Sequence, residues 1–224
     1  MNSTHPAALE LQDVSCVFGE GPRQVVALNQ VSLVVEPGEL VAVMGPSGSG
    51  KSTLLNVAGL LQQPTSGRVL IDGADVAQLN RARAAQVRRT RVGLVFQNYN
   101  LIPTLTVGEN VGLPLELDGV SPREAVLTAL AEVGLDGLAD RFPEEISGGQ
   151  AQRVAIARAL IGPRTVLLAD EPTGALDTST GEGVLRVLRS RIDAGAAGIL
   201  VTHEPRFAAW ADRTVMMRDG VIQS

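Results

Sequence analysis

Runs of mostly apolar residues alternate with stretches of helical character along this chain of 224 residues. Four runs have the length and composition of buried strands and lie between turn residues, at 40–44, 92–96, 165–169 and 199–202. Helices are predicted between them, over 52–61, within 98–162 and over 178–192. Strands that alternate with helices predict an α/β fold with a mainly parallel sheet, whose ligands bind at the carboxyl ends of its strands.

A second, antiparallel β layer is predicted from strand-like runs outside that core. Four such runs lie at 9–18, 25–28, 31–35 and 67–73. Most of them precede the first core strand, so we expect the layer to form at the N-terminal side of the fold. Residues 1–8 are expected to be a frayed tail in which His5 is solvated.

The segment 98–162 is predicted to be a helical insertion between two core strands. Ser121-Pro122-Arg123-Glu124 predicts a capping box with proline at the first helical position, and Gly134 would end that helix. A second helix would begin near Ser147 and end at Gly162-Pro163. We therefore expect one domain over 1–224, with a core of 1–97 and 163–224 and a helical subdomain of two helices over 98–162.

A glycine-rich turn follows the first core strand. Gly45-Pro46-Ser47-Gly48-Ser49-Gly50-Lys51-Ser52 fits the P-loop pattern G-x-x-x-x-G-K-[ST]. The glycines let backbone N–H groups approach phosphate oxygens, and the following helix adds the positive end of its dipole. Lys51, the only lysine among 19 basic residues, would reach the β- and γ-phosphates, and the Ser52 hydroxyl would bind Mg²⁺. A turn that binds nothing is the alternative, and the flanking strand and helix argue against it.

Polar residues follow the other core strands directly: Gln97, Asp170-Glu171 and His203. In a parallel sheet these positions meet at one edge, next to the P-loop. Asp170 has the place of the acidic Mg²⁺ partner of P-loop ATPases. Glu171 is placed to orient and deprotonate an attacking water. Acidic pairs after a strand are often only helix caps, but together with the P-loop the pair indicates nucleotide hydrolysis.

Composition narrows the class of protein. A net charge of −5 and a pI near 5.1 give no reason to expect nucleic-acid binding. The single cysteine, Cys16, excludes an internal disulfide and is expected to be a buried thiol in a reducing cytoplasm. No apolar stretch reaches the length of a membrane span, and no signal peptide is expected. The arginine-rich segment 81–91 predicts a solvated surface helix, with anion binding as the alternative.

The order of motifs resembles that of the ABC ATPases over about residues 9–222. Ile146–Arg153 is similar to their signature, LSGGQxxR, with Ile146 in place of the usual leucine and Ala151 in place of a common polar residue. Ala175-Leu176-Asp177 resembles their D-loop, and Thr202-His203 resembles their switch histidine. The other motifs also come in the family's order. The P-loop and Gln97 precede the signature, and Asp170-Glu171 lies between the signature and the D-loop.

The resemblance implies that two ATP molecules are held between two head-to-tail copies, so we expect a homodimer. The signature residues Ser147, Gly148, Gly149 and Gln150 would contact phosphates bound by the partner's P-loop. Gln97 would sense Mg²⁺ and the attacking water, His203 would touch the γ-phosphate, and Asp177 would couple the two sites. Phe18 would stack on adenine, with a place in the core as the alternative.

The expected site can be stated by role. The catalytic residues are Lys51, Glu171 and His203. The Mg²⁺ ligands are Ser52, Gln97 and Asp170. The residues expected to bind ATP are Phe18, Gly45, Pro46, Ser47, Gly48, Ser49, Gly50, Lys51, Ser52, Thr53, Gln97, Ser147, Gly148, Gly149, Gln150 and Asp177.

Three further motifs resemble the lipoprotein-release, macrolide-export and cell-division group of this family. They are Phe96–Pro103, Glu109-Asn110-Val111 and Glu171-Pro172-Thr173-Gly174. This implies an ATP-hydrolysing subunit at the inner face of the cell membrane that powers a separate permease for export or extraction of a lipoprotein, peptide or drug-like substrate. The alternatives are a mechanical subunit that regulates a cell-envelope hydrolase through a permease-like partner, and a soluble ABC ATPase that acts on DNA or ribosomes.

Overall fold

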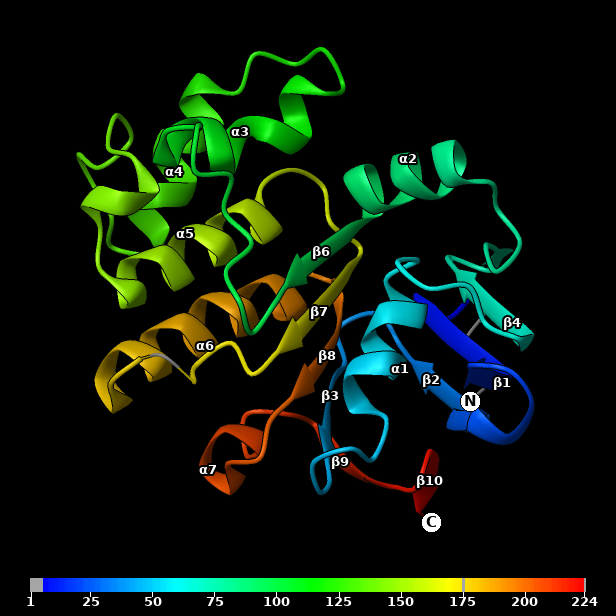
Figure 1. The fold of residues 1–224 in the computed structure, drawn as a ribbon. Helices are drawn as coiled ribbons and strands as arrows, with labels where there is room; N and C mark the ends of the chain where they lie inside the picture. The colour runs from blue at the N-terminus through cyan, green and yellow to red at the C-terminus, as the bar shows by residue number, and fades with distance from the viewer. Residues whose placement is uncertain (1–5, 175, 224) are drawn as a thin grey trace.

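The computed structural model describes residues 6–174 and 176–223 (Figure 1). Its central element is a six-stranded sheet in which neighbouring strands are parallel, except in a C-terminal hairpin. In spatial order the strands are β10 (Val221–Gln223), β9 (Arg213–Arg218), β3 (Leu40–Met44), β8 (Ala197–Val201), β7 (Val166–Asp170) and β6 (Val92–Val95). The predicted mainly parallel sheet is confirmed.

The central strands are apolar along their length because both faces of the sheet are covered. In β7, Val166 and Leu168 belong to a core shared with α1 (Lys51–Ala58) and the N-terminal strands. The intervening Leu167 and Ala169 belong to a second core, shared with the helical insertion and with α6 (Thr178–Asp193). Successive side chains of one strand therefore pack into two separate cores on opposite faces of the sheet.

The N-terminal strands form the predicted antiparallel layer. Its order is β2 (Val25–Val35), β1 (Leu9–Phe18), β4 (Ser66–Ile71) and β5 (Ala74–Asp75). The expected break at residues 29–30 is wrong, because β2 runs through it as one strand. Gln30 takes a left-handed conformation with φ 50°, and its N–H donates to Ser15 Oγ at 3.0 Å, where the register between β1 and β2 shifts. Cys16 is buried in this layer, as expected.

The expectation of a frayed segment is wrong at Ala8. Ala8 is buried, and its carbonyl accepts a hydrogen bond from the Asp72 N–H at 3.1 Å. Pro6 is exposed, whereas His5 lies outside the described residues. Ala8 therefore belongs to the fold, next to the start of β1.

The helical insertion contains three helices, so the expectation of two is wrong. After α2 (Arg81–Arg91) and β6 come α3 (Val107–Glu116), α4 (Arg123–Glu132) and α5 (Gly148–Leu160). The missed helix, α3, holds two glycines and Pro114, which lower helix propensity. It is stabilised instead by burial, since Val107 and Val111 are fully inaccessible. No helix in the described part of the chain is long and apolar enough to cross a bilayer.

The start of α4 also differs from expectation. The capping box predicted at residues 121–124 is wrong: Pro122 is the N-cap residue, and no side chain caps this helix. Pro122 packs against α3 at Gly112, where a Cβ would lie 2.8 Å from the proline ring. The capping boxes occur elsewhere, at Thr106 with Glu109 and at Ser147 with Gln150. The remaining short helices are η1 (Gly21–Arg23), η2 (Pro143–Glu145) and α7 (Pro205–Ala208).

Asn110 fixes the loop that enters α3. Its side chain is fully buried and accepts from the Ile102 N–H at 2.7 Å. Its amide N–H groups face the carbonyls of Ile102, Leu105 and Thr106, each at 3.0 Å. One side chain thus replaces the backbone pairing that this irregular loop lacks.

We predict that Asn110→Ala lowers the free energy of unfolding by about 3 kcal/mol, because several buried backbone groups lose their partner. Urea unfolding followed by circular dichroism measures the change. Asn29→Ala, at an exposed asparagine, is the matched control and should stay within about 0.5 kcal/mol of wild type. Equal stabilities for the two variants would contradict this role.

Candidate nucleotide site

The turn between β3 and α1 is built so tightly that only glycine fits at two positions. Gly45 has φ 151°, and a Cβ there would lie 2.0 Å from the Met217 carbonyl oxygen. Gly50 has φ 100°, and its Cβ would lie 2.3 Å from the carbonyl oxygen of Ala27. The turn is therefore pressed between the C-terminal hairpin and the antiparallel sheet.

Lys51 is the first residue of α1 and folds back over this turn. Its ammonium donates to the carbonyl oxygens of Gly45 at 2.9 Å and Pro46 at 2.8 Å. Ser52, one residue further into the helix, is exposed. Ser49 is buried, and its Oγ has no hydrogen-bond partner among the described residues. The helix start thus presents a cation, a hydroxyl and free N–H groups to one region, an arrangement suited to an anion.

The strand ends meet in one pocket of about 420 Å³. It brings together the P-loop with Gln97, Asp170, Glu171 and His203, as the order of the strands predicted. Pro46 and Ser49 do not line the pocket, whereas the lining from the P-loop and α1 consists of Gly45, Ser47, Gly48, Gly50, Lys51, Ser52 and Thr53. A cavity that combines one ammonium, two carboxylates and the start of a helix can hold a phosphate chain with a cation.

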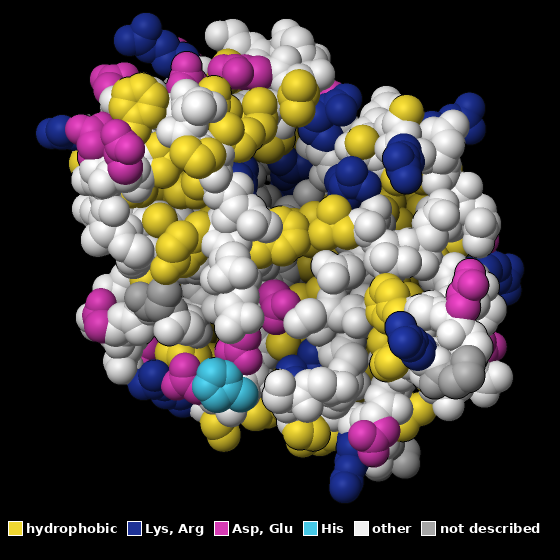
Figure 2. Space-filling model, viewed as in Figure 1, with side chains coloured by type: hydrophobic (Ala, Val, Ile, Leu, Met, Phe, Trp, Pro, Cys, Tyr) yellow, Lys and Arg dark blue, Asp and Glu magenta, His cyan; other side chains and the backbone are white. Residues whose placement is uncertain are grey.

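Glu171 and His203 are in direct contact across this pocket. His203 Nδ1 lies 2.8 Å from Glu171 Oε1, and this hydrogen bond and the negative charge of Glu171 raise the pKa of His203. Glu171 is largely buried, whereas the His203 side chain is 69% exposed and lies at the surface in Figure 2. Glu171 has φ 48°, and its N–H donates to the Val201 carbonyl at 3.0 Å. The backbone thus holds the carboxylate in place while the imidazole remains accessible.

Residues of β2 complete the pocket, and reasoning from the sequence missed them. Val25, Val26 and Ala27 line it, and the two valines are 61% and 53% exposed. The only available signal was two adjacent valines in a strand, one of which must face outward. Phe18 pairs with Val25 in the β1–β2 register but does not line the pocket. Its side chain is 42% exposed, so the alternative of a core position is wrong, and adenine stacking stays a prediction.

The signature residues lie outside this pocket. Ser147 caps α5 by accepting from the Gln150 N–H at 3.3 Å, and Gln150 Oε1 accepts from the Ser147 N–H at 2.8 Å. Gly148 is exposed, while Gly149 and Gln150 are partly buried. In Figure 1, α1 and α5 lie on opposite sides of β7, in agreement with their two different cores. Within one copy, the structure does not bring the signature to the P-loop.

Asp177 forms the N-cap of α6. Its carboxylate accepts from Ser179 Oγ at 2.7 Å and from the Thr180 hydroxyl and N–H at 2.6 and 3.1 Å. These hydrogen bonds, those from Thr180 first, lower the pKa of Asp177. The structure thus gives the residue a local capping role, and its coupling role remains a prediction. Ala175, in the same motif, lies outside the described residues.

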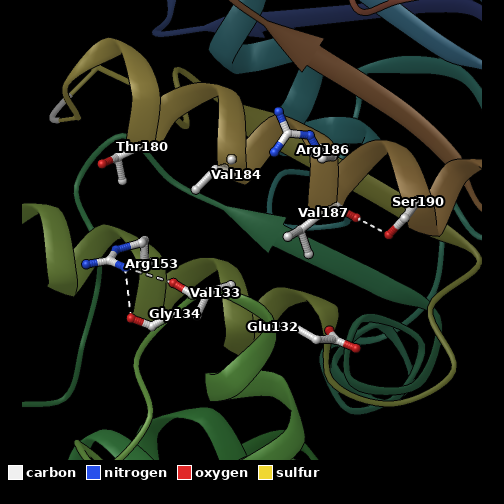
Figure 3. A pocket seen from close by; sticks show the side chains of 10 residues that line it. Glu132, Val133, Gly134, Arg153, Thr180, Val184, Arg186, Val187 and Ser190 are labelled. Carbon is white, nitrogen blue, oxygen red and sulfur yellow. Dashed lines mark hydrogen bonds between the residues drawn. The ribbon is translucent and has the colours of Figure 1, made fainter.

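A larger hollow of about 500 Å³ lies between the end of α4, α5 and α6 (Figure 3). Arg153 of α5 points to the end of α4 and donates to the carbonyls of Val133 at 2.9 Å and Gly134 at 3.0 Å. Val184 and Val187 of α6 form part of the opposite wall. None of the strand-end polar residues lines it, so size alone does not identify the site. The last residue of the signature pattern, Arg153, serves here to join two helices.

Comparison with known proteins finds similarity to ABC transporter proteins. A sequence profile described as ABC transporter matches residues 28–174. A macrolide export ATP-binding/permease protein of Shigella flexneri is 45% identical over 217 residues, and one of Brucella melitensis is 47% identical over 219 residues. Each match covers 96% of this chain but 34% of the relative, so the chain spans about a third of the curated relatives' length.

Solved structures also resemble this fold. One is a dimeric ATP-binding cassette in a post-hydrolysis state bound to ADP and Pi, and another is a dimeric bacterial ABC transporter cassette. Each has a TM-score of 0.92 and 40% sequence identity, and covers 96% of this chain and 97% of the solved chain.

We predict that Glu171→Gln lowers the pKa of His203 toward its ordinary value in nucleotide-free protein, because an amide supplies no negative charge. An NMR titration of the two histidines measures this, and a His203→Gln sample identifies the signal. Glu204→Gln is the control: its charge is a lesser cause of the raised pKa, so the decrease should be smaller. An unchanged pKa in Glu171→Gln would show that the contact does not form in solution.

Proposed function

Because this chain belongs to the ABC transporter family, we propose that it is the ATP-hydrolysing unit of an export complex and works as a head-to-tail pair of copies. One observation carries the proposal. The P-loop and the strand-end carboxylates share a pocket, whereas the signature lies on the other side of the sheet. A single copy therefore holds only part of the machinery that its motifs describe.

Lys51 would bind the β- and γ-phosphates of ATP. The ammonium now rests on two carbonyl oxygens of its own loop, so it can exchange these neutral acceptors for charged phosphate oxygens without a rearrangement of the backbone. The N–H groups at the start of α1 would bind the same phosphates. The exposed valines of β2 would lie beside the rest of the nucleotide.

The pocket offers oxygen donors that fit Mg²⁺. Ser52, Gln97 and Asp170 all line it and supply a hydroxyl, an amide oxygen and a carboxylate. Mg²⁺ is usually held by one or two carboxylates together with waters and phosphate oxygens, so this small set is sufficient. The bound ion would neutralise charge on the phosphates during hydrolysis.

Glu171 would act as the general base. Its backbone is fixed by the Val201 hydrogen bond, so the carboxylate can orient a water and accept a proton from it. His203, next to it, would donate a hydrogen bond to the γ-phosphate, and its raised pKa favours the protonated form for that task. Gln97, exposed at the same pocket, would contact the water and the ion.

The second copy would supply the signature. The capped start of α5 exposes Ser147 and Gly148, and backbone N–H groups there can bind a γ-phosphate held by the other copy. The solved relatives named above are dimeric. A homodimer with two composite sites follows, and Asp177, the N-cap of α6, would couple them.

The membrane partner would be a permease. The curated relatives are named macrolide export ATP-binding/permease proteins and are about three times as long as this chain. Their name favours export of a drug-like molecule over extraction of a lipoprotein or peptide. The chain would then sit at the inner face of the cell membrane, held there by its partner.

We predict that Glu171→Gln reduces ATP hydrolysis by about 10²–10⁴-fold while ATP binding persists, because the general base is lost and the phosphate contacts are not. Phosphate release measures the rate, and light scattering with saturating ATP should show a stable dimer of the variant.

Glu182→Gln, an exposed carboxylate on α6, is the matched control and should hydrolyse ATP like wild type. Wild-type turnover in Glu171→Gln would contradict the proposal that Glu171 is the general base. If the Glu171→Gln variant binds ATP but stays monomeric, the proposed head-to-tail dimer would be contradicted.

A further inference from the structure

Gln152 of α5 is a polar side chain in the interior of the fold. It is 1% exposed, and Ala151, Val154 and Ala155 next to it along the helix are also buried. Its amide Nε2 donates to the carbonyl oxygen of Pro172 at 2.9 Å. Its amide oxygen, Oε1, is buried without a hydrogen-bond partner among the described residues. A buried glutamine with one polar group satisfied and the other unpaired calls for an explanation.

Stability alone does not account for a glutamine at this position. Burial of an unpaired amide oxygen is unfavourable, whereas a methionine of similar length would fill the same space without it. Only the N–H that reaches the Pro172 carbonyl distinguishes the glutamine favourably from such an apolar side chain. The reason for this residue is therefore to be sought in the segment that the hydrogen bond holds.

That segment carries Glu171, whose backbone is strained. Glu171 has φ 48°, a left-handed conformation that persists in a glutamate only where the surrounding structure imposes it. Its N–H donates to the Val201 carbonyl at 3.0 Å, and its own carbonyl accepts from the Gly174 N–H at 3.1 Å. Pro172, the next residue, is buried and has no N–H, so its carbonyl is its only backbone hydrogen-bonding group. The strained residue is thus anchored from β8 on one side and from α5 on the other.

We propose that Gln152 is a positioning residue for the general base. Its amide holds the Pro172 carbonyl, and this anchor keeps the Glu171 carboxylate where it can orient a water. The same helix begins with the signature, five residues before Gln152 at its N-cap Ser147. The inference rests on the proposed function, in which a copy's signature serves one composite site and its general base serves the other. The hydrogen bond therefore connects the two sites through a single copy.

The first test uses the full chain with Gln152→Met and without nucleotide. A shift of the loop weakens the contact of Glu171 with His203, so the pKa of His203 should fall toward its ordinary value in an NMR titration. Gln152→Leu, which also lacks the donor, should behave in the same way and replaces the methionine variant if that variant does not fold.

Ile156→Val is the matched control for this titration. Ile156 lies one turn further along α5 and is fully buried, so the change removes a core methyl group but no hydrogen bond. His203 in this control should titrate as in wild type. An unchanged pKa of His203 in the Gln152 variants, or an equal fall in the control, would overturn the proposal.

The second test separates catalysis from ATP binding. Gln152→Met should lower kcat about tenfold and leave KM within about twofold of wild type, because the base is misplaced while the P-loop is unaffected. Ile156→Val should keep the wild-type kcat. A raised KM with an unchanged kcat would assign Gln152 to ATP binding and overturn the proposal, and so would wild-type values of both constants.

The third test asks in which copy Gln152 acts. A mixed dimer of a Lys51→Ala copy and a Ser147→Arg copy retains one complete site, built from Lys51 and Glu171 of the Ser147→Arg copy and the signature of the other. Gln152→Met in the Ser147→Arg copy should lower hydrolysis about tenfold, whereas in the Lys51→Ala copy it should change the rate less than about twofold.

The reverse pattern, or equal losses in the two mixed dimers, would show that Gln152 supports the signature instead of the base. Mixed dimers that hydrolyse no ATP even with Gln152 intact would contradict the proposed head-to-tail function. The titration of His203 needs neither ATP nor a second copy, so it decides this inference independently of that outcome.

Discussion

The close approach of the P-loop backbone to two carbonyl groups is the constraint on which the rest of the structure depends. Gly45 meets the carbonyl of Met217 and Gly50 meets that of Ala27, at distances that leave no room for a side chain. The Gly220 N–H also donates to Ser49 O at 3.1 Å, and the Asn29 N–H donates to Gly220 O at 2.9 Å. The two sheets thus pack against the loop from both sides. They preorganise its N–H groups for binding an anion.

This packing explains why the C-terminal hairpin and the antiparallel layer belong to the site, although neither carries a proposed catalytic group. The hairpin β9–β10 extends the sheet at β3 and supplies the carbonyl that closes the loop. Strand β2 supplies the second carbonyl and the exposed valines of the pocket. On the opposite side of β3, strands β8 and β7 deliver His203 and Glu171 to the same edge, where they contact each other.

Local patterns predicted most of this arrangement. The continuous apolar strands, the P-loop and the polar residues at the strand ends could be read from neighbouring residues, since each depends on short-range chemistry. Helix α3 could not, because Gly108, Gly112 and Pro114 oppose a helix that burial and Asn110 stabilise. The left-handed conformation at Gln30 depends on the Ser15 hydroxyl of another strand.

The arginine-rich helix α2 illustrates the same limit of local reasoning. A solvated surface explains Arg81 and Arg83, which are exposed, but Arg88 and Arg89 turn into a groove. Their surroundings come from Asp118 and Arg164, 29 and 75 residues away from Arg89 along the chain. The alternative of anion binding at this helix stays a prediction.

The central claim is that each ATP is held by the P-loop of one copy and the signature of the other. The most direct test mixes two inactive variants, Lys51→Ala and Ser147→Arg, after each has been shown to fold. A mixed dimer would contain one site with an intact lysine and an intact signature, so the account predicts that ATP hydrolysis returns on mixing. Mixed dimers that form but stay inactive, or a Ser147→Arg protein that is fully active alone, would contradict it.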